Sequence, residues 1–174
     1  MANFFRKNKI VIIGIMSDTH GDVKRTAKAI AALKQYKPDH VIHCGDIGSD
    51  AVLTELAAGF ADPEVPVTCV LGNVDGYTDL FSPSAHVQVV GRFATLTIDG
   101  KKIAVAHGDD ARRLIGAIQS GDYDYVFTGH THERSDEHEG RTRVINPGAL
   151  HRSREPGCAV LDVTTDQLTY LSII

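Results

Sequence analysis

Short apolar runs rich in valine and isoleucine recur along the chain and, in its first part, alternate with stretches of helical periodicity. The early runs are apolar throughout, which is typical of parallel strands that are covered on both faces. The predicted strands are Ile10–Met16, His40–Cys44, Val67–Leu71, Phe93–Ile98, Ile103–Ala106, Tyr125–Thr128, Arg143–Ile145, Cys158–Val163 and Leu168–Ile173. This pattern restricts the chain to the α/β class, in which helices pack against a largely parallel sheet.

Helical periodicity predicts three helices, each preceded by a residue of a type that caps helix N-termini. The helices are Val23–Lys37 after Asp22, Asp50–Ala58 after Ser49, and Ala111–Gln119 after Asp110. In the first helix an apolar stripe is expected to face the core, with lysines and arginines on a solvated face. The stripe consists of Val23, Ala27, Ile30 and Ala31.

The later part of the chain departs from this alternation. Asp99-Gly100 lies between two apolar runs and predicts a β-hairpin. Several short strands near the C-terminus have no helices between them, and they suggest a second sheet. The predicted fold is therefore α/β, a two-sheet β-sandwich flanked by helices. The length of 174 residues fits one domain, so residues 1–174 are expected to form a single domain.

Polar residues stand directly after five of the predicted strands. They are Asp18 and His20, Asp46, Asn73, His107, and His130 and His132. Ligands of open α/β sheets bind outside the carboxyl ends of the strands, so these seven side chains are expected to meet at one rim. The glycines at 45, 72, 108 and 129 adjoin them, where the backbone must turn sharply and approach a ligand closely.

Two carboxylates, one amide oxygen and four imidazoles suit borderline-to-hard divalent cations. We predict Mn²⁺, with Ni²⁺, Fe²⁺, Zn²⁺, Co²⁺ or Mg²⁺ as alternatives. One ion would leave most of these groups unused, whereas two ions use all seven if one carboxylate bridges them. Two cations about 3.5–4 Å apart clamp the attacking and leaving oxygens of a phosphoryl displacement. The alternative is that each residue caps a helix or bonds loop backbone, which would suffice for one such residue but not for seven.

The blocks D-x-H at 18–20, G-D at 45–46, G-N-x-D at 72–75, H-G at 107–108 and G-H-T-H at 129–132 resemble the calcineurin-like metallophosphoesterases in order and spacing. The resemblance spans Asp18 to about Leu150. The short length and the N-P-G-A-L block at 146–150 are similar to the small prokaryotic phosphodiesterase branch. The resemblance implies a metal-dependent phosphoesterase, and more narrowly a phosphodiesterase, with a dinuclear site in a two-sheet sandwich.

The resemblance also implies two ligand sets that share Asp46 as a bridge. The first metal would be held by Asp18, His20, Asp46 and His132, and the second by Asp46, Asn73, His107 and His130. A hydroxide between the two metals would attack phosphorus in line, since the metals acidify bound water and neutralise the phosphate oxygens. Asp46, Asn73 and His107 are the residues predicted to be catalytic.

Val74 departs from the wider superfamily, in which many members have a histidine after the asparagine. That histidine helps to stabilise the transition state or to protonate the leaving oxygen, and valine can do neither. The small branch commonly lacks it too, so the expectation of metal binding is unchanged. Since a positioned acid is typically worth about 10²–10⁴-fold in rate, monoesterase activity is expected to be weak.

Five histidines lie outside these motifs. His43 lies inside a predicted strand, which favours a structural histidine over a site residue. His151, with Arg152 and Arg154, follows the N-P-G-A-L block and could reach a substrate phosphate. Arginines and acidic residues alternate through 133–155, however, so a surface charge network is an equal alternative. The other three are predicted to lie on the surface: His40, His86 and His138.

Two other functional classes are alternatives to an enzyme. A nucleotide-binding Rossmann or P-loop protein would carry G-x-G-x-x-G or G-x-x-x-x-G-K-[ST] after the first strand, and neither occurs. The second is a non-catalytic, metal-binding interaction scaffold of the same fold, because a eukaryotic sorting-complex subunit shares the fold and also lacks the histidine after asparagine. That scaffold type has lost other ligands, whereas all seven remain here, which favours the enzyme.

Composition narrows the partners and the compartment. Lys and Arg number 18 against 22 Asp and Glu, so the net charge of −4 argues against nucleic acid as a partner. The basic N-terminus precedes an apolar run shorter than the ~18 residues of a membrane span, so a strand is expected instead of a signal or anchor. Three cysteines without a C-x-x-C pair indicate reduced thiols and a cytoplasmic protein: Cys44, Cys69 and Cys158. A small-molecule phosphodiester is the expected substrate class. No readable motif identifies the particular substrate. A homo-oligomer is possible.

Overall fold

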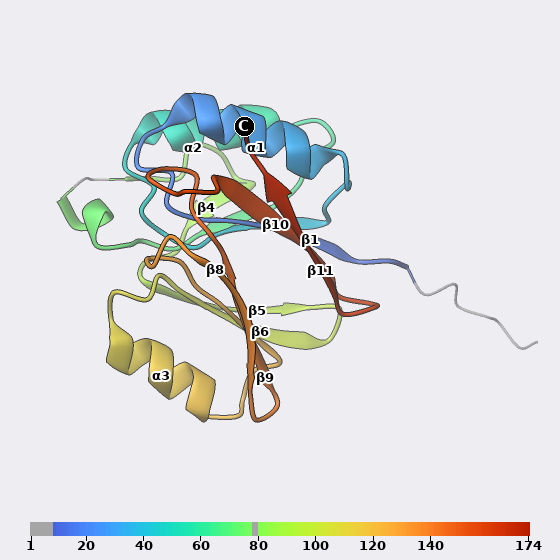
Figure 1. Cartoon of the computed structure of the whole chain (residues 1–174). Helices are drawn as coiled ribbons and strands as arrows, with labels where there is room; N and C mark the ends of the chain where they lie inside the picture. The colour runs from blue at the N-terminus through green and yellow to red at the C-terminus, as the bar shows by residue number, and fades with distance from the viewer. Residues whose placement is uncertain (1–8, 78–79) are drawn as a thin grey trace, which may run out of the picture.

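The computed structural model describes residues 9–77 and 80–174. Two β-sheets pack face to face, with α1 and α2 over the outer face of one sheet and α3 over the outer face of the other (Figure 1). This arrangement confirms the predicted two-sheet α/β sandwich flanked by helices. Among the described residues, no helix combines the length and the apolar character that crossing a membrane requires.

The first sheet has six strands in the order β11-β10-β1-β2-β3-β4. Their bounds are β1 Ile12–Met16, β2 His40–His43, β3 Val67–Cys69, β4 Val87–Val89, β10 Gly157–Asp162 and β11 Gln167–Ser172. The strands β1 to β4 run parallel, and β10 pairs antiparallel with β1. The carboxyl ends of β1, β2 and β3 therefore point to the same edge of the sheet.

The second sheet has five strands in the order β5-β6-β7-β9-β8. Their bounds are β5 Phe93–Ile98, β6 Lys101–Ala106, β7 Tyr125–Phe127, β8 Arg134–Glu139 and β9 Thr142–Pro147. The strands β6, β7 and β9 run parallel, and β5 and β6 form the predicted hairpin. Asp99 and Gly100 both adopt positive φ in its turn, at 51° and 75°, which is the conformation that Asp-Gly favours between two strands.

Three α-helices and one short 3₁₀ helix connect the strands: α1 Val23–Lys34, α2 Asp50–Gly59, α3 Ala111–Gln119 and η1 Val74–Tyr77. The carboxylates of Asp22 and Asp110 accept the N–H groups of Arg25 and Arg113, as N-caps do. Ser49 occupies the N-cap position of α2, but its hydroxyl makes no capping bond. Two of the three predicted caps therefore act through their side chains.

Three apolar layers hold the sandwich together. Met16, Leu33 and Leu56 belong to the layer between the first sheet and the helices α1 and α2. Ile15 and Phe127 belong to the layer between the two sheets, and a smaller cluster lies under α3. Because the sheets are covered on both faces, the early strands are apolar throughout, as the sequence pattern indicated.

Some predicted elements were wrong in detail. The strands β10 and β11 join the first sheet beside β1, so the C-terminal strands do not all belong to the second sheet. The strands β4 and β8 were not predicted, because β4 is very short and β8 reads RSDEHE without an apolar alternation. The helix α1 ends at Lys34, since Lys37 precedes Pro38 and adopts a φ of 51°.

The buried side of α1 is rotated relative to the predicted stripe. Its buried residues are Thr26, Ala29, Ile30 and Leu33. Thr26 faces inward because its hydroxyl donates to the Asp22 carbonyl at 2.8 Å, which satisfies the polar group. Ala31 is exposed instead of buried. The apolar pattern alone therefore missed a threonine whose hydroxyl is satisfied within the helix.

Two histidines predicted for the surface are half-buried. Nε2 of His40 lies 2.9 Å from the Thr68 hydroxyl, and burial lowers the pKa of His40 to about 4. Nε2 of His86 donates to the Ala57 carbonyl at 3.1 Å. The prediction fails for these two because each lies at the end of a strand of the first sheet, where neighbouring elements cover part of the ring. His138 is exposed, as predicted.

Candidate metal centre

The loops after β1, β2, β3, β6 and β7 meet at one edge of the sandwich. The N–H of Asp18 donates to the Gly45 carbonyl at 3.0 Å, and the N–H of His20 donates to the Asp46 carbonyl at 2.9 Å. Across the two sheets, the N–H of His130 donates to Oδ2 of Asp18 at 3.1 Å. The predicted rim at the carboxyl ends of the strands is therefore formed, with contributions from both sheets.

Asp18, His20 and His132 form the first cluster of candidate ligands. Nε2 of His132 lies 3.1 Å from Oδ1 of Asp18, and Nε2 of His20 lies 3.8 Å from the same oxygen. The two imidazole nitrogens are 3.4 Å apart. Asp18 is fully buried, whereas the two histidine side chains keep 20% and 24% of their surface exposed. The cluster thus has a buried carboxylate beneath two imidazoles that solvent can reach.

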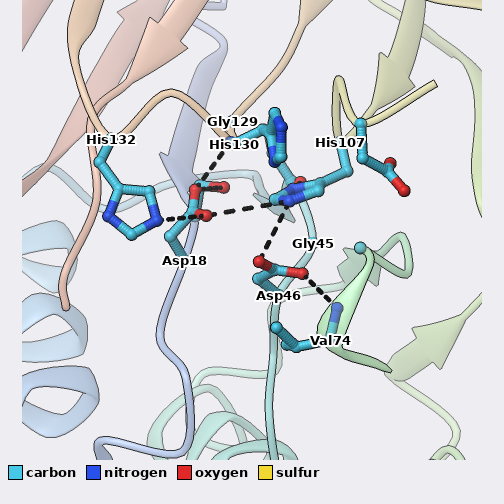
Figure 2. Close-up of polar contacts among 12 residues, drawn as sticks. Asp18, Gly45, Asp46, Val74, His107, Gly129, His130 and His132 are labelled. Carbon is cyan, nitrogen blue, oxygen red and sulfur yellow. Dashed lines mark hydrogen bonds and ion pairs between the residues drawn. The ribbon is translucent and has the colours of Figure 1, made fainter. Parts of the chain in front are cut away.

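Asp18, Asp46 and His107 form the second cluster, which is buried throughout (Figure 2). Nε2 of His107 lies 3.3 Å from Oδ2 of Asp46 and 3.9 Å from Oδ1 of Asp18. Oδ2 of Asp46 also lies 3.5 Å from Nε2 of His20. The two clusters therefore overlap, and this oxygen of Asp46 lies close to an imidazole of each.

Each carboxylate has one anchored oxygen and one that faces the clusters. Oδ2 of Asp18 accepts from the Ser17 hydroxyl at 2.6 Å as well as from the His130 N–H, while Oδ1 is buried and has no hydrogen-bond partner among residues 9–77 and 80–174. Oδ1 of Asp46 accepts the Val74 N–H at 3.0 Å, which leaves Oδ2 facing His107 (Figure 2). The same Oδ2 atom also faces His20. The backbone thus fixes both carboxylates in orientations that direct one oxygen of each inward.

The histidine tautomers agree with this arrangement. Nδ1 of His107 donates to the Cys44 carbonyl at 2.8 Å, so its Nε2 presents a lone pair toward the carboxylates. This buried Nε2 atom has no hydrogen-bond partner in the described part of the chain. Nδ1 of His132 donates to the Arg152 carbonyl at 3.4 Å, with the same consequence. Acceptor nitrogens and carboxylate oxygens that face one another require a positive charge between them, so these residues fit a divalent cation.

The pKa values of His107 and Asp46 depend on the same contacts. Burial acts to lower the pKa of His107, but the close approach of Asp46 and the charges of both carboxylates raise that pKa above the ordinary value. Burial acts to raise the pKa of Asp46, yet His107 and the Val74 N–H hold it below the ordinary value. The Asp46 carboxylate therefore remains charged and attracts a proton or a cation to the centre.

Backbone strain is concentrated at the predicted ligands. Nine non-glycine residues among those described adopt positive φ, and five of them are predicted ligands. These five are Asp18, His20, Asp46, His130 and His132, with φ between 45° and 69°. Such conformations cost about 1–3 kcal/mol each and cluster at functional sites. The loops are thus held in shapes that local preference does not favour.

His130 and Asn73 lie at the margin of the clusters. The His130 ring contacts the His107 ring edge-on, with centroids 5.1 Å apart (Figure 2). Asn73 is exposed and lies between Gly72 and Val74. A Cβ at Gly72 would overlap the Asp46 side chain, so only glycine allows this loop to approach so closely. Five of the seven predicted ligands therefore converge, and the remaining two lie on adjoining loops.

His43 and Thr19 form a buried link that the sequence did not reveal as part of the site. The Gly45 N–H donates to Nδ1 of His43 at 3.2 Å, so Nε2 carries the proton and donates to the Thr19 hydroxyl at 2.9 Å. That hydroxyl donates in turn to the Ile47 carbonyl at 3.0 Å. Burial lowers the pKa of His43 to about 4, which keeps the ring neutral. His43 is thus a structural histidine, as predicted, and it connects the loops that carry the two aspartates.

Asp75 and Asn146 support the remaining loops. Buried Asp75 accepts the N–H groups of Ile47, Gly48 and Gly72 at 2.8–3.0 Å. The Asn146 amide donates to the Gly129 carbonyl at 2.9 Å and thereby holds the G-H-T-H loop. Their positions in the G-N-x-D and N-P-G-A-L blocks are the sequence signal that could have identified them.

A family model described as the calcineurin-like phosphoesterase superfamily domain matches residues 11–166. The chain belongs to this superfamily. It is a phosphoester hydrolase, and the family implies divalent metal cofactors, for which the two overlapping clusters supply candidate ligands.

Two relatives match nearly the whole of this phosphoesterase. A phosphodiesterase of Methanocaldococcus jannaschii is 34% identical over 168 residues, which cover 93% of this chain and 98% of the relative. The solved structure of an archaeal phosphodiesterase superimposes with a TM-score of 0.80 at 32% identity, covering 93% of this chain and 99% of that one.

The fold is also similar to that of vacuolar protein sorting 29 of Cryptosporidium parvum. The TM-score is 0.65 at 18% identity, over 93% of this chain and 96% of that one. A likeness at this identity shows a shared fold only, so the metal-facing side chains have to carry the functional argument.

Proposed function

We propose that this phosphoesterase is a phosphodiesterase that works with two divalent cations, Mn²⁺ being the first choice. The proposed ligands are Asp18, His20, Asp46 and His132 for one ion, and Asp46, Asn73, His107 and His130 for the other. The observation that carries the proposal is the pair of overlapping clusters, in which Oδ1 of Asp18 and Nε2 of His107 are buried and find no hydrogen-bond partner among the described residues. The relative named a phosphodiesterase, at 34% identity, supports the diester preference.

Asp46 is the proposed bridge and, with Asn73 and His107, the proposed catalytic set. Its Oδ2 lies at 3.3 and 3.5 Å from imidazoles of the two ligand sets, and its Oδ1 is held by the Val74 N–H. The two ions, when bound, would acidify a water molecule and offset the charge of the phosphate oxygens. The protein supplies orientation: carbonyl partners fix the tautomers of His107 and His132, and the His43–Thr19 link keeps the loops together.

The diester preference also has a basis in Val74. This residue begins η1, and its backbone, instead of a proton-donating side chain, contacts Asp46. His43 cannot replace the missing acid, since both of its ring nitrogens are bonded and the side chain is fully buried. Without a positioned acid, esters whose leaving groups depart as stable anions should react best.

The substrate class, the partners, the domain organisation and the compartment are also proposed as the sequence indicates them. The substrate is a small-molecule phosphodiester, the sequence gives no strong signal for nucleic acid as a partner, and residues 1–174 act as one domain. Among the described residues all three cysteines are buried free thiols, which supports a reducing compartment, the cytoplasm.

Metal loading tests the proposal directly. Protein stripped with a chelator, incubated with Mn²⁺ and desalted should contain close to two metal ions per chain by elemental analysis. It should then hydrolyse bis(4-nitrophenyl) phosphate faster than 4-nitrophenyl phosphate. His138→Ala, which removes an exposed histidine outside the clusters, serves as the control and should change neither result. Less than one metal per chain would contradict the dinuclear site, and a fully loaded protein without hydrolysis would favour the scaffold alternative.

A further inference from the structure

A cavity of about 520 Å³ opens beside the proposed metal centre. Its walls come from two segments, residues 131–134 after β7 and residues 152–155 before β10. Of the seven predicted ligands only His132 lines it, so the cavity begins where the first cluster ends. Pockets for small organic ligands have volumes of about 300–1,000 Å³, so this cavity suits a group the size of a nucleoside.

The segment before β10 is bonded to the metal centre through its backbone. The Arg152 carbonyl accepts from Nδ1 of His132, and Arg152 itself adopts a φ of 49°. The Ser153 hydroxyl donates to the His132 carbonyl at 3.4 Å. The N–H of His151 donates to the Asp18 carbonyl at 3.0 Å. The side chains of this segment therefore start from points that are fixed relative to the candidate ligands.

The cavity carries an excess of unpaired positive charge. Arg134 is engaged, since its guanidinium lies 3.4 Å from Glu155 and also donates to the Leu171 carbonyl. Arg152 and Arg154 are exposed, and within the described part of the chain neither guanidinium has an ion pair or a hydrogen bond. Glu133 is the one lining carboxylate without an ion pair among the described residues. Among the described residues, the lining therefore contains two guanidinium groups and one carboxylate that have no ion pair.

These features favour a binding site over a surface charge network for two of the arginines. A network would pair Arg152 and Arg154 with acidic neighbours, as Arg134 is paired with Glu155. A planar guanidinium matches two oxygens of a phosphate at once, and hydrogen bonds between two charged groups are stronger than neutral ones. Two free guanidinium groups beside a metal centre for phosphoesters therefore suit a second phosphate on the same substrate.

We propose that this cavity binds the arm of the substrate beyond the scissile phosphate, and that Arg152 and Arg154 bind a second phosphate group on that arm. The inference rests on the proposed phosphodiesterase function. The preferred substrates are then small phosphodiesters that carry an additional phosphomonoester on a nucleoside-sized or sugar-sized group. Glu133, on the other segment that lines the cavity, would accept hydrogen bonds from hydroxyl or amino groups of that arm.

Two substrates that differ only in the second phosphate test the proposal. They are the 4-nitrophenyl ester of thymidine 5′-phosphate and the same ester with a 3′-phosphate. For the wild type, the second phosphate should lower KM by about tenfold or more with little change in kcat. The double variant Arg152→Ala/Arg154→Ala should lose this advantage and keep its metal content. Arg112→Ala, an exposed arginine on α3 outside the cavity, is the matched control and should retain it.

Equilibrium binding provides a readout that needs no turnover. Calorimetric titration of the Mn²⁺-loaded protein with thymidine 3′,5′-bisphosphate and with thymidine 5′-phosphate should show tighter binding of the bisphosphate, lost in the double variant. Equal affinities in the wild type, or a preference that survives in the double variant, would overturn the proposal. If both esters are hydrolysed equally well, the site for the second phosphate is rejected and the proposed phosphodiesterase function is retained. Preferential binding without hydrolysis of either ester rejects the proposed function and leaves the site supported.

Discussion

Asp75 holds two metal-binding loops together, and replacing it with asparagine should destabilise the protein measurably. Its side chain is 1% exposed. Oδ2 accepts the N–H groups of Ile47 and Gly72 at 3.0 and 2.9 Å, and Oδ1 accepts that of Gly48 at 2.8 Å. Ile47 and Gly48 follow Asp46 in the chain, and Gly72 precedes Asn73. One carboxylate therefore fixes the loop after β2 against the loop after β3.

The expected magnitude follows from the number of bonds that an amide can keep. In Asp75→Asn, the single amide oxygen can occupy the Oδ2 position and retain two of the three bonds to the N–H groups of Ile47, Gly48 and Gly72, now without the charge. The amide NH₂ then faces the Gly48 N–H, and two donors cannot bond to each other. A lost hydrogen bond to a charged group is worth about 1.5–3 kcal/mol. We therefore expect the free energy of unfolding to fall by about 2–3 kcal/mol.

Urea unfolding of chelator-treated protein near neutral pH measures this change without a contribution from metal binding. Asp122→Asn is the matched control, because Asp122 is exposed, and surface substitutions of this kind stay within about 0.5 kcal/mol. The Asp75 variant should also bind Mn²⁺ more weakly, since it loosens the loops that carry Asp46 and Asn73. A variant as stable as the control would refute the argument that these three N–H groups depend on the carboxylate.

Three further predictions follow from single side chains. Asp46→Ala should lose more activity and more bound metal than Asn73→Ala, because the proposed bridge serves both ions; equal losses would argue against bridging. Val74→His should raise kcat/KM on aryl monoesters by up to ~10²-fold and make the rate depend less steeply on leaving-group pKa. An unchanged slope of rate against leaving-group pKa would show that another group already supplies the proton. His40, whose pKa burial lowers to about 4, stays neutral when folded while the unfolded chain takes up a proton below about pH 6.5. Stability should therefore fall between about pH 6.5 and pH 4, and His40→Gln should show a smaller fall in urea unfolding of metal-free protein; identical profiles would assign the pH dependence elsewhere.

The sequence predicted which candidate ligands converge at one edge because the prediction depended on a general property of parallel strands. Asp18, Asp46 and His107 each follow an apolar run, and the carboxyl ends of parallel strands meet at one edge. The predicted two-sheet architecture was confirmed for the same reason, since apolar runs indicate strands covered on both faces. The role of each ligand and the number of ions stay predictions.

Strand partners were harder to predict than strands. The pairing of β10 with β1 joins Ile12 to Asp162, far apart in the chain, and no local pattern encodes that choice. The strand β8 is almost entirely polar, so it gave no apolar signal, yet Asp136 on it binds Arg143 of β9 at 2.8 Å. Pairing that depends on backbone bonds and ion pairs is invisible to a search for apolar periodicity.

The supporting polar groups were equally hard to recognise. His43 was predicted to be structural, but its position in an apolar strand does not show which groups it connects. Its function depends on Gly45 and Thr19, which reach it only after the loops have folded. The partial burial of His40 was missed because its partner, Thr68, lies on the neighbouring strand β3. Hydrogen-bond partners across strands become apparent only once the register is known.

The metal centre combines features that are individually unfavourable for folding. Asp18, Asp46 and His107 place ligand atoms within 4.8 Å of one another in a buried position, and two of these groups are carboxylates. Five predicted ligand residues adopt strained backbone, and two buried polar atoms of the clusters have no hydrogen-bond partner within the described ranges. A divalent cation would offset the repulsion and satisfy those atoms, so its binding energy would contribute directly to the stability of the loops. The hydrogen bonds of His43, Thr19 and Asp75 act in the same direction, because they hold the loops in place before any ion arrives.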